Sequence, residues 1–203
     1  MMLGLGHDVV DIAAFATQLE EPGAGMRRLF SPRELRQSAI RAQVKHDGEA
    51  VHLAAKWAGK EAVLKAWCEA LASASLPLPY TIDDFPWAQI EILDDSRGVP
   101  HVTFAADPQR RLSDSLALLL RHSVSSDDES MPIAAASENG MRPIPDPVSS
   151  VRRLRSGVQA SARSTRSGRL DSAASGMMPM WHLSLSHDGP IASAVAILAA
   201  TSA

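Results

Sequence analysis

Four charged residues that could form a reactive site, three lysines and a glutamate, lie within one short stretch of the chain. Residues 52–67, HLAAKWAGKEAVLKAW, carry three of the four lysines together with a glutamate: Lys56, Lys60, Glu61 and Lys65. Ammonium groups neutralise phosphate oxygens, and a carboxylate beside them can bind a hard cation or accept a proton. We therefore expect a site built around Glu61.

Asp8 is the second carboxylate of interest. It lies in residues 3–12, LGLGHDVVDI, whose apolar and β-branched side chains predict a buried strand. Burying a lone carboxylate is costly unless a cation or hydrogen-bond donors compensate it. Asp8 is therefore a metal ligand or general base, or else a solvated carboxylate at the end of the strand. Gly4 and Gly6 predict a close approach of another backbone or of a ligand.

The stretch around Glu61 predicts a long helix over residues 49–73. At 100° per residue its large apolar side chains share one stripe, and Lys60 falls within that stripe. A lysine in such a position usually has a charged partner or a ligand. Spacing alone leaves a second interpretation open, in which Lys60 extends its amine to the surface and Glu61 pairs with Lys65 on the helix exterior.

The remaining pattern predicts shorter elements around this helix. Apolar periodicity and turn residues indicate helices and strands as follows: helices over 13–21, 31–43 and 107–122, and strands over 3–12, 87–95, 101–104, 180–186 and 191–198. SPRE, at the start of the second helix, predicts a capped helix terminus. The turn SRGVP predicts that the strands on either side of it form a hairpin.

Composition divides the chain into one domain and one insertion. Residues 1–121 and 179–203 carry the periodic pattern, whereas 122–178 is rich in Ser, Ala, Gly, Pro and Arg and lacks aromatic residues and lysine. A compact domain seldom contains so long a structureless loop, so we interpret 122–178 as a disordered insertion. Its arginines are then solvated, although they could also contact an acidic partner.

Charge and hydropathy exclude several classes of protein. A net charge of −3 argues against a nucleic-acid partner, because nucleic-acid-binding modules usually carry a clear basic excess. No apolar run approaches the roughly 20 residues needed to span a bilayer, and no basic signal-peptide region precedes Asp8. The single cysteine, Cys68, suits a reducing compartment and is interpreted as a small core residue. We expect a cytoplasmic protein.

A polar row lies near the C-terminal end of the sequence. In WHLSLSH, His182, Ser184 and Ser186 share one face of a predicted strand, and such a row is suited to binding phosphate or hydroxyl groups. The chain has no nucleophile elbow around a serine. It also lacks a Walker A loop, a complete dinucleotide glycine fingerprint and zinc-ligand spacing.

Taken in order, five motifs resemble one family. GLGHDVVDI, RLFSPREL, HLAAKWAGKEAVLKAW, the turn ending in RGVP, and HLSLSHD are similar to those of the holo-acyl-carrier-protein synthases, the small bacterial 4′-phosphopantetheinyl transferases, and of their actinobacterial branch in particular. The resemblance covers about residues 1–121 and 179–200. It implies an α+β fold, in which a mainly antiparallel sheet packs against one long helix and shorter helices.

The resemblance also implies a reaction and a site. Such enzymes move 4′-phosphopantetheine from coenzyme A to a serine of apo-acyl-carrier protein and release adenosine 3′,5′-bisphosphate. The family's Mg²⁺ ligands match Asp8 and Glu61, and two carboxylates with water and diphosphate oxygens suit that cation. Lys60 and Lys65 are then phosphate-neutralising cations, with Lys65 nearer the transferred phosphoryl group, and Lys56 replaces a common arginine.

Further coenzyme contacts follow from the same resemblance. Gly98 and Pro100 match a G-x-P turn near the nucleotide, and His182 and Ser184 match the strand that faces coenzyme A, with His187 as a weaker candidate. The serine proton would go to Glu61 or to a metal-held water, with Asp8 as the alternative base. The family is homotrimeric, so a neighbour's residues 180–189 would complete the groove at Asp8 and Glu61.

Four features depart from the family pattern. Basic residues expected after the aspartate motif, which hold the acidic carrier, are here Ala13 and Ala14, so the arginines near the second helix could provide that surface instead: Arg27, Arg28 and Arg33. Trp67, Cys68 and Glu69 replace a glycine-rich turn, which predicts a longer helix. The third departure is the insertion itself, and Val99 also replaces a common lysine.

Two other functions remain open at this point. The chain could be a non-catalytic subunit that binds coenzyme A or a carrier protein with the same fold, an interpretation favoured by Ala13, Ala14 and Val99. It could also be a metal-dependent diphosphate hydrolase, in which water replaces the serine as the attacking group.

Overall fold

The computed structural model describes residues 1–23, 25–127 and 177–202. In chain order, its elements are β1 (Met2–Asp11), α1 (Ile12–Glu20), the 3₁₀ turn η1 (Met26–Leu29), α2 (Pro32–Lys45), α3 (Glu49–Ala72), η2 (Trp87–Gln89), β2 (Ile90–Asp94), β3 (Pro100–Phe104), α4 (Ala106–Asp127), β4 (Met177–Asp188) and β5 (Ile191–Ser202). The predicted elements are all present within one or a few residues.

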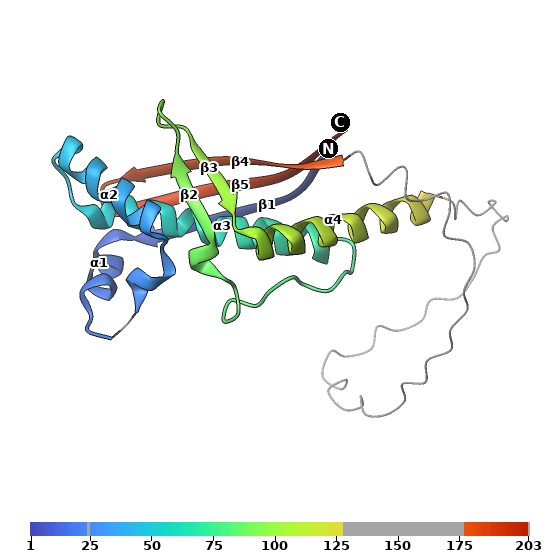
Figure 1. The fold of residues 1–203 in the computed structure, drawn as a ribbon, viewed down its shortest axis with the longest axis horizontal. Coiled ribbons are helices and arrows are strands. Elements are labelled where there is room, and N and C mark those ends of the chain that lie inside the picture. The colour runs from blue at the N-terminus through green and yellow to red at the C-terminus, as the bar shows by residue number, and fades with distance from the viewer. Residues whose placement is uncertain (24, 128–176, 203) are drawn as a thin grey trace, which may run out of the picture.

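Two antiparallel sheets organise these elements. The larger sheet has the strand order β1-β5-β4, and β2 and β3 form the predicted hairpin. Figure 1 shows the three long strands running along α3, while the β2–β3 hairpin crosses them and α2 lies at one end. The predicted α+β class with a long helix against an antiparallel sheet is confirmed.

Helix α3 is the centre of the core because it is covered on most of its surface. Leu53, Trp67 and Leu71 are buried as the stripe predicts, and the small side chains beside them, such as Ala58 and Ala62, are also buried. Alanines on that face let the sheet pack closely against the helix. The helix runs to Ala72, which confirms the longer helix expected from the lost glycine turn.

Gly4 and Gly6 allow β1 to lie directly on α3. A Cβ atom at Gly6 would stand 1.9 Å from the carbonyl oxygen of Ala62, and one at Gly4 would stand 2.1 Å from that of Ala66. Neither backbone oxygen can move without disturbing the helix. The close approach predicted for these glycines is therefore to another backbone, and it fixes the height of Asp8 above α3.

The two ends of the predicted insertion differ from expectation. Helix α4 continues to Asp127, beyond its predicted end at 122, and β4 already begins at Met177. Residues 128–176 lie outside the described residues, so the disorder predicted for 122–178 remains a prediction there. Within the described part of the chain, no helix is both long and apolar enough to cross a bilayer.

Candidate functional site

Asp8, Glu61 and Lys65 meet where β1 lies on α3. Lys65 Nζ donates to Asp8 Oδ1 at 2.6 Å and to the carbonyl oxygen of His7 at 3.3 Å, and it lies 4.0 Å from Glu61 Oε2. Asp8 faces inward because alternate β1 side chains turn toward the helix, and Glu61 and Lys65 are one helical turn apart. The structure thus brings together the three predicted catalytic residues.

Two carboxylates, Asp8 and Glu61, share this cluster with the single ammonium group of Lys65. Burial and, next to it, the negative charge of Asp8 raise the pKa of Glu61 from 4.5 to about 6, while the Lys65 ammonium opposes that rise. Asp8 is largely buried, and its Oδ2 atom has no hydrogen-bond partner among the described residues. Both observations indicate that Lys65 alone does not supply enough positive charge and donors for the two carboxylates.

These groups fit the Mg²⁺ ion that the family resemblance implies. A buried carboxylate oxygen without a partner is a free ligand atom, and Mg²⁺ is often held by one or two carboxylates with the rest of its shell from water and substrate phosphates. No group of three or more His, Cys, Asp or Glu side chains in the described residues could hold a metal alone. Asp8 and Glu61 would therefore hold the ion with oxygens from a ligand or water.

Lys60 is placed differently from its prediction. It is fully buried, and its ammonium group lies 2.9 Å from Glu34 Oε2 while donating to the carbonyl oxygens of Trp87 and Ile90 at 2.6 Å each. All three of its donors are therefore satisfied inside the protein. The charged partner expected for Lys60 is therefore Glu34. This buried position does not support the prediction that Lys60 contacts phosphate. It also does not support the alternative in which the Lys60 amine reaches the surface.

The Glu34–Lys60 pair ties three elements together. Glu34 is the third residue of α2 and closes a capping box with Ser31, as SPRE predicted. Its second oxygen, Oε1, accepts from the backbone N–H of Ile92 in β2 at 2.9 Å. A buried charge pair with every remaining group hydrogen-bonded links α2, α3 and the hairpin, which positions the walls of the pocket described next.

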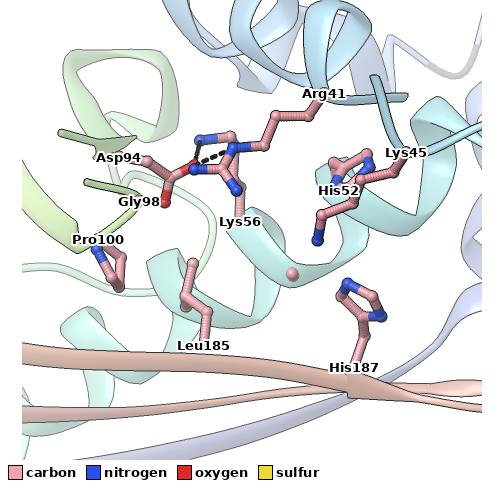
Figure 2. A pocket seen from close by; sticks show the side chains of 10 residues that line it. Arg41, Lys45, His52, Lys56, Asp94, Gly98, Pro100, Leu185 and His187 are labelled. Carbon is pink, nitrogen blue, oxygen red and sulfur yellow. Dashed lines mark ion pairs between the residues drawn. The ribbon is translucent and has the colours of Figure 1, made fainter. Parts of the chain in front are cut away.

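Lys56 lies at the base of a basic pocket between α2, α3, the β2–β3 turn and β4 (Figure 2). The pocket has a volume of about 120 Å³ and is lined as follows: Arg41, Lys45, His52, Ala55, Lys56, Asp94, Gly98, Pro100, Leu185 and His187. It unites three predicted coenzyme-binding residues, namely Lys56, Gly98 and Pro100. Gly98 has a φ of +83°, which the tight turn before Pro100 requires.

Charge in this pocket is mostly positive. Lys56 Nζ donates to Gln37 Oε1 at 2.8 Å and to the Ile92 carbonyl at 2.7 Å, and it lies 3.8 Å from Asp94 Oδ2. Asp94 also pairs with Arg41 at 3.1 Å, as the dashed lines in Figure 2 show. Burial lowers the pKa of Lys56, and the charge of Asp94 opposes that shift. An anion entering the pocket would add counter-charge to these cations.

Sequence reasoning missed several pocket residues that spacing could have indicated. Arg41 and Lys45 are four residues apart on α2, and His52 and Lys56 are four apart on α3, so each pair shares a helix face. His52 Nε2 lies 2.8 Å from Asp47 Oδ1, and its ring packs edge-on against His187 with centroids 6.0 Å apart. His187, the weaker candidate, therefore lies in the pocket.

His182 and Ser184 lie outside this pocket. On β4 the side chains of Leu183 and Leu185 pack toward the core, and Leu185 and His187 line the pocket. Since side chains alternate along a strand, His182 and Ser184 are exposed on the opposite face of the sheet. The predicted polar row exists, but within one chain it faces away from the other candidate residues.

The site consists of two separate halves. Glu61 and Lys65 face β1, whereas Lys56 lies about 140° around the helix from Glu61 and faces α2 and β2. The sheet order β1-β5-β4 puts Asp8 on one edge strand and His187 on the other. The acidic half and the basic half of the site are therefore on different sides of α3.

The chain is similar to known proteins along most of its length. It matches the 4′-phosphopantetheinyl transferase superfamily over residues 4–134. It is 46% identical to a holo-[acyl-carrier-protein] synthase of Bifidobacterium animalis subsp. lactis over 97% of both chains. It is 61% identical to that of Bifidobacterium adolescentis over 59% of this chain and 82% of the relative.

A solved structure shares the fold. The Chronobacterium ammoniagenes ACPS–CoA complex superposes with a TM-score of 0.57 at 24% identity, covering 96% of this chain and 95% of that chain. This likeness agrees with the α+β fold described above. Together, the family match over residues 4–134 and the near full-length identity show that this chain belongs to the 4′-phosphopantetheinyl transferase superfamily, as an enzyme of its holo-acyl-carrier-protein synthase family.

Proposed function

We propose that the enzyme transfers 4′-phosphopantetheine from coenzyme A to a serine hydroxyl of an apo-acyl-carrier protein, with Mg²⁺ as cofactor and adenosine 3′,5′-bisphosphate as the product released. The single observation that carries this proposal is the cluster of Asp8, Glu61 and Lys65. In this cluster a buried Asp8 oxygen, which has no hydrogen-bond partner among the described residues, lies beside a carboxyl with a raised pKa. The carrier protein is inferred from the relatives, which are holo-[acyl-carrier-protein] synthases. Coenzyme A is inferred from the solved ACPS–CoA complex that shares the fold.

The reaction requires one bond to form and one to break. The serine oxygen attacks the phosphorus atom that carries the pantetheine arm, and the bond from that phosphorus to the bridging oxygen of the diphosphate breaks. Glu61 accepts the serine proton directly or through water, because a carboxyl with a pKa of about 6 is mostly ionised at neutral pH yet more basic than an ordinary one. Lys65 offers positive charge to the phosphoryl oxygens. Mg²⁺, when bound, supplies charge neutralisation at the diphosphate.

The basic pocket would hold the nucleotide end of coenzyme A. Lys56, Arg41 and Lys45 surround a space large enough for a phosphate group, and the Gly98–Pro100 turn forms one wall. Because Lys56 is held by Gln37 and a backbone carbonyl, its ammonium is already oriented and loses little side-chain freedom on binding. His187 is a further contact on the β4 side.

A homotrimer would explain why the site is divided. One coenzyme molecule could reach both halves if the β1 edge of one subunit lay beside the β4 edge of its neighbour, so that His182 and Ser184 also faced a groove. The outer face of β1 exposes apolar side chains suited to such an interface: Leu5 is 47% exposed and Val9 is 52% exposed.

Docking of the carrier protein would involve arginine residues near the start of α2. Arg27 pairs with Glu49 and Arg33 pairs with Glu91, so an acidic carrier would compete with partners inside this chain. Arg28 is the third member of this predicted surface, and Ala13 and Ala14 lie on the neighbouring helix α1. Fatty-acid biosynthesis as the pathway and the cytoplasm as the compartment remain predictions.

The proposal is tested by incubating the protein with coenzyme A, Mg²⁺ and candidate apo-carriers and measuring intact mass. The expected result is a mass increase equal to one phosphopantetheine, and this increase should not occur when EDTA is added. Binding of coenzyme A without any carrier modification would favour the non-catalytic subunit. Cleavage of coenzyme A without a carrier would favour the hydrolase.

A further inference from the structure

Lys65 donates to Asp8, one of the two carboxylates that would hold a divalent cation. Its ammonium donates to Asp8 Oδ1 at 2.6 Å and to the His7 carbonyl at 3.3 Å, and Glu61 Oε2 is 4.0 Å away. Carboxylate and carbonyl oxygens are also the ligands of hard cations. An ammonium ion and a metal ion are therefore alternative counter-charges for the Asp8 carboxylate, whose second oxygen, Oδ2, has no hydrogen-bond partner among the described residues.

The surroundings of Lys65 make it the mobile member of this group. Its side chain is 51% exposed, whereas that of Asp8 is only 9% exposed and is fixed by the packing of β1 on α3. Lysine carries a compact charge on a flexible four-carbon stem, so Lys65 can move into solvent while Asp8 stays in place. The fully buried Lys60, held by three acceptors, shows what a structural lysine looks like in the same helix.

We propose that Lys65 is a displaceable counter-ion: it neutralises Asp8 in the metal-free enzyme, leaves Asp8 when a divalent cation binds, and is thereby released toward the ligand. This inference rests on the proposed metal site at Asp8 and Glu61. It adds that cation binding and the position of Lys65 are coupled, so that the phosphate-binding lysine becomes free only when the cation is in place. In the metal-free enzyme, the same contact prevents two adjacent carboxylates from facing each other without a counter-charge.

Titration of the metal-free protein with Mg²⁺, followed by calorimetry, tests the coupling. If Lys65 competes with the cation, Lys65→Met binds Mg²⁺ at least about threefold more tightly than the wild type, the size expected for losing one partly exposed ion pair. Lys65→Arg keeps the competing charge and remains within about twofold of the wild type. Lys45→Met, which removes the other exposed lysine, controls for net charge and leaves the affinity nearly unchanged.

A second measurement needs no substitution. The chain has only four lysines, so ¹³C labelling of the lysine side chains gives few signals to assign. The Lys65 Cε signal should move during the Mg²⁺ titration with the same midpoint as the calorimetric signal, while the buried Lys60 signal stays in place.

The outcomes separate this inference from the proposed function. Saturable Mg²⁺ binding to the wild type, with no tightening in Lys65→Met or with a stationary Lys65 signal, overturns the counter-ion role and leaves the metal site intact. Absence of saturable Mg²⁺ binding to the wild type overturns both. A Lys65→Met protein that does not fold leaves the decision to the Lys65 signal of the wild type.

Discussion

Replacing Glu61 by glutamine should stabilise the metal-free protein at neutral pH while removing its activity. Glu61 is mostly buried beside Asp8, and these surroundings raise its pKa from 4.5 to about 6. An acid whose folded-state pKa is raised favours the native state when protonated, so its ionisation destabilises the fold as the pH increases from 4.5 toward 6 and above. Glutamine has nearly the same shape and cannot ionise.

The size of the effect follows from the shift. A rise of about 1.5 in pKa corresponds to about 2 kcal/mol of unfolding free energy once both states are ionised, as they are at pH 7. At pH 4 the carboxyl is mainly protonated in both states, so the difference in stability between the wild type and the Glu61→Gln variant should nearly vanish. We therefore expect Glu61→Gln to gain about 1–2 kcal/mol at pH 7 and almost nothing at pH 4.

Urea denaturation in EDTA at the two pH values measures this directly. Saturating Mg²⁺ should reduce or reverse the difference, because a ligand at 100 times its Kd stabilises the wild type by about 2.7 kcal/mol and the variant has lost one of the two metal-binding carboxylates. A Glu61→Gln protein that is less stable than the wild type at pH 7 in EDTA would refute this reasoning. A stability difference that does not change with pH would contradict the reasoning equally.

Three further substitutions test other parts of the account. Lys60→Met should cost about 3–5 kcal/mol in urea denaturation, because it leaves the buried charge of Glu34 unpaired; a loss below about 1 kcal/mol would show that the pair is not structural. Gly6→Ala should prevent β1 from packing on Ala62, so we expect little folded protein by circular dichroism, and a stable variant would contradict the observed close approach. Lys56→Met should weaken coenzyme A binding at least about tenfold in calorimetry, as expected for a buried charged hydrogen bond to phosphate; unchanged affinity would place the coenzyme elsewhere.

The sequence predicted the elements of this fold well because their signals are local. The capping box at Ser31 and the apolar stripe of α3 each depend on residues a few positions apart. The pairing of Asp8 with Glu61 came from the family resemblance, since nothing local relates a strand to a helix more than 50 residues later. The structure then added the reason for Gly6, which is contact with the helix backbone.

Two site predictions depended on local patterns that different environments share. Lys60 and Lys56 both lie in the buried part of α3, and only the three-dimensional position of Glu34 reveals that one lysine is held entirely within the core. The family resemblance ranked His187 below His182, and strand alternation alone does not say which face of β4 meets the pocket. The surroundings of these side chains depend on tertiary contacts, which periodicity in the sequence does not specify.

The most direct test of the central claim is the intact mass of an apo-acyl-carrier protein after incubation with this enzyme, coenzyme A and Mg²⁺. The account predicts a mass gain of one phosphopantetheine with the wild type and none with Asp8→Asn or Glu61→Gln, both of which remain folded. A carrier that gains the same mass with either variant at the wild-type rate would contradict the assignment of the site to Asp8 and Glu61.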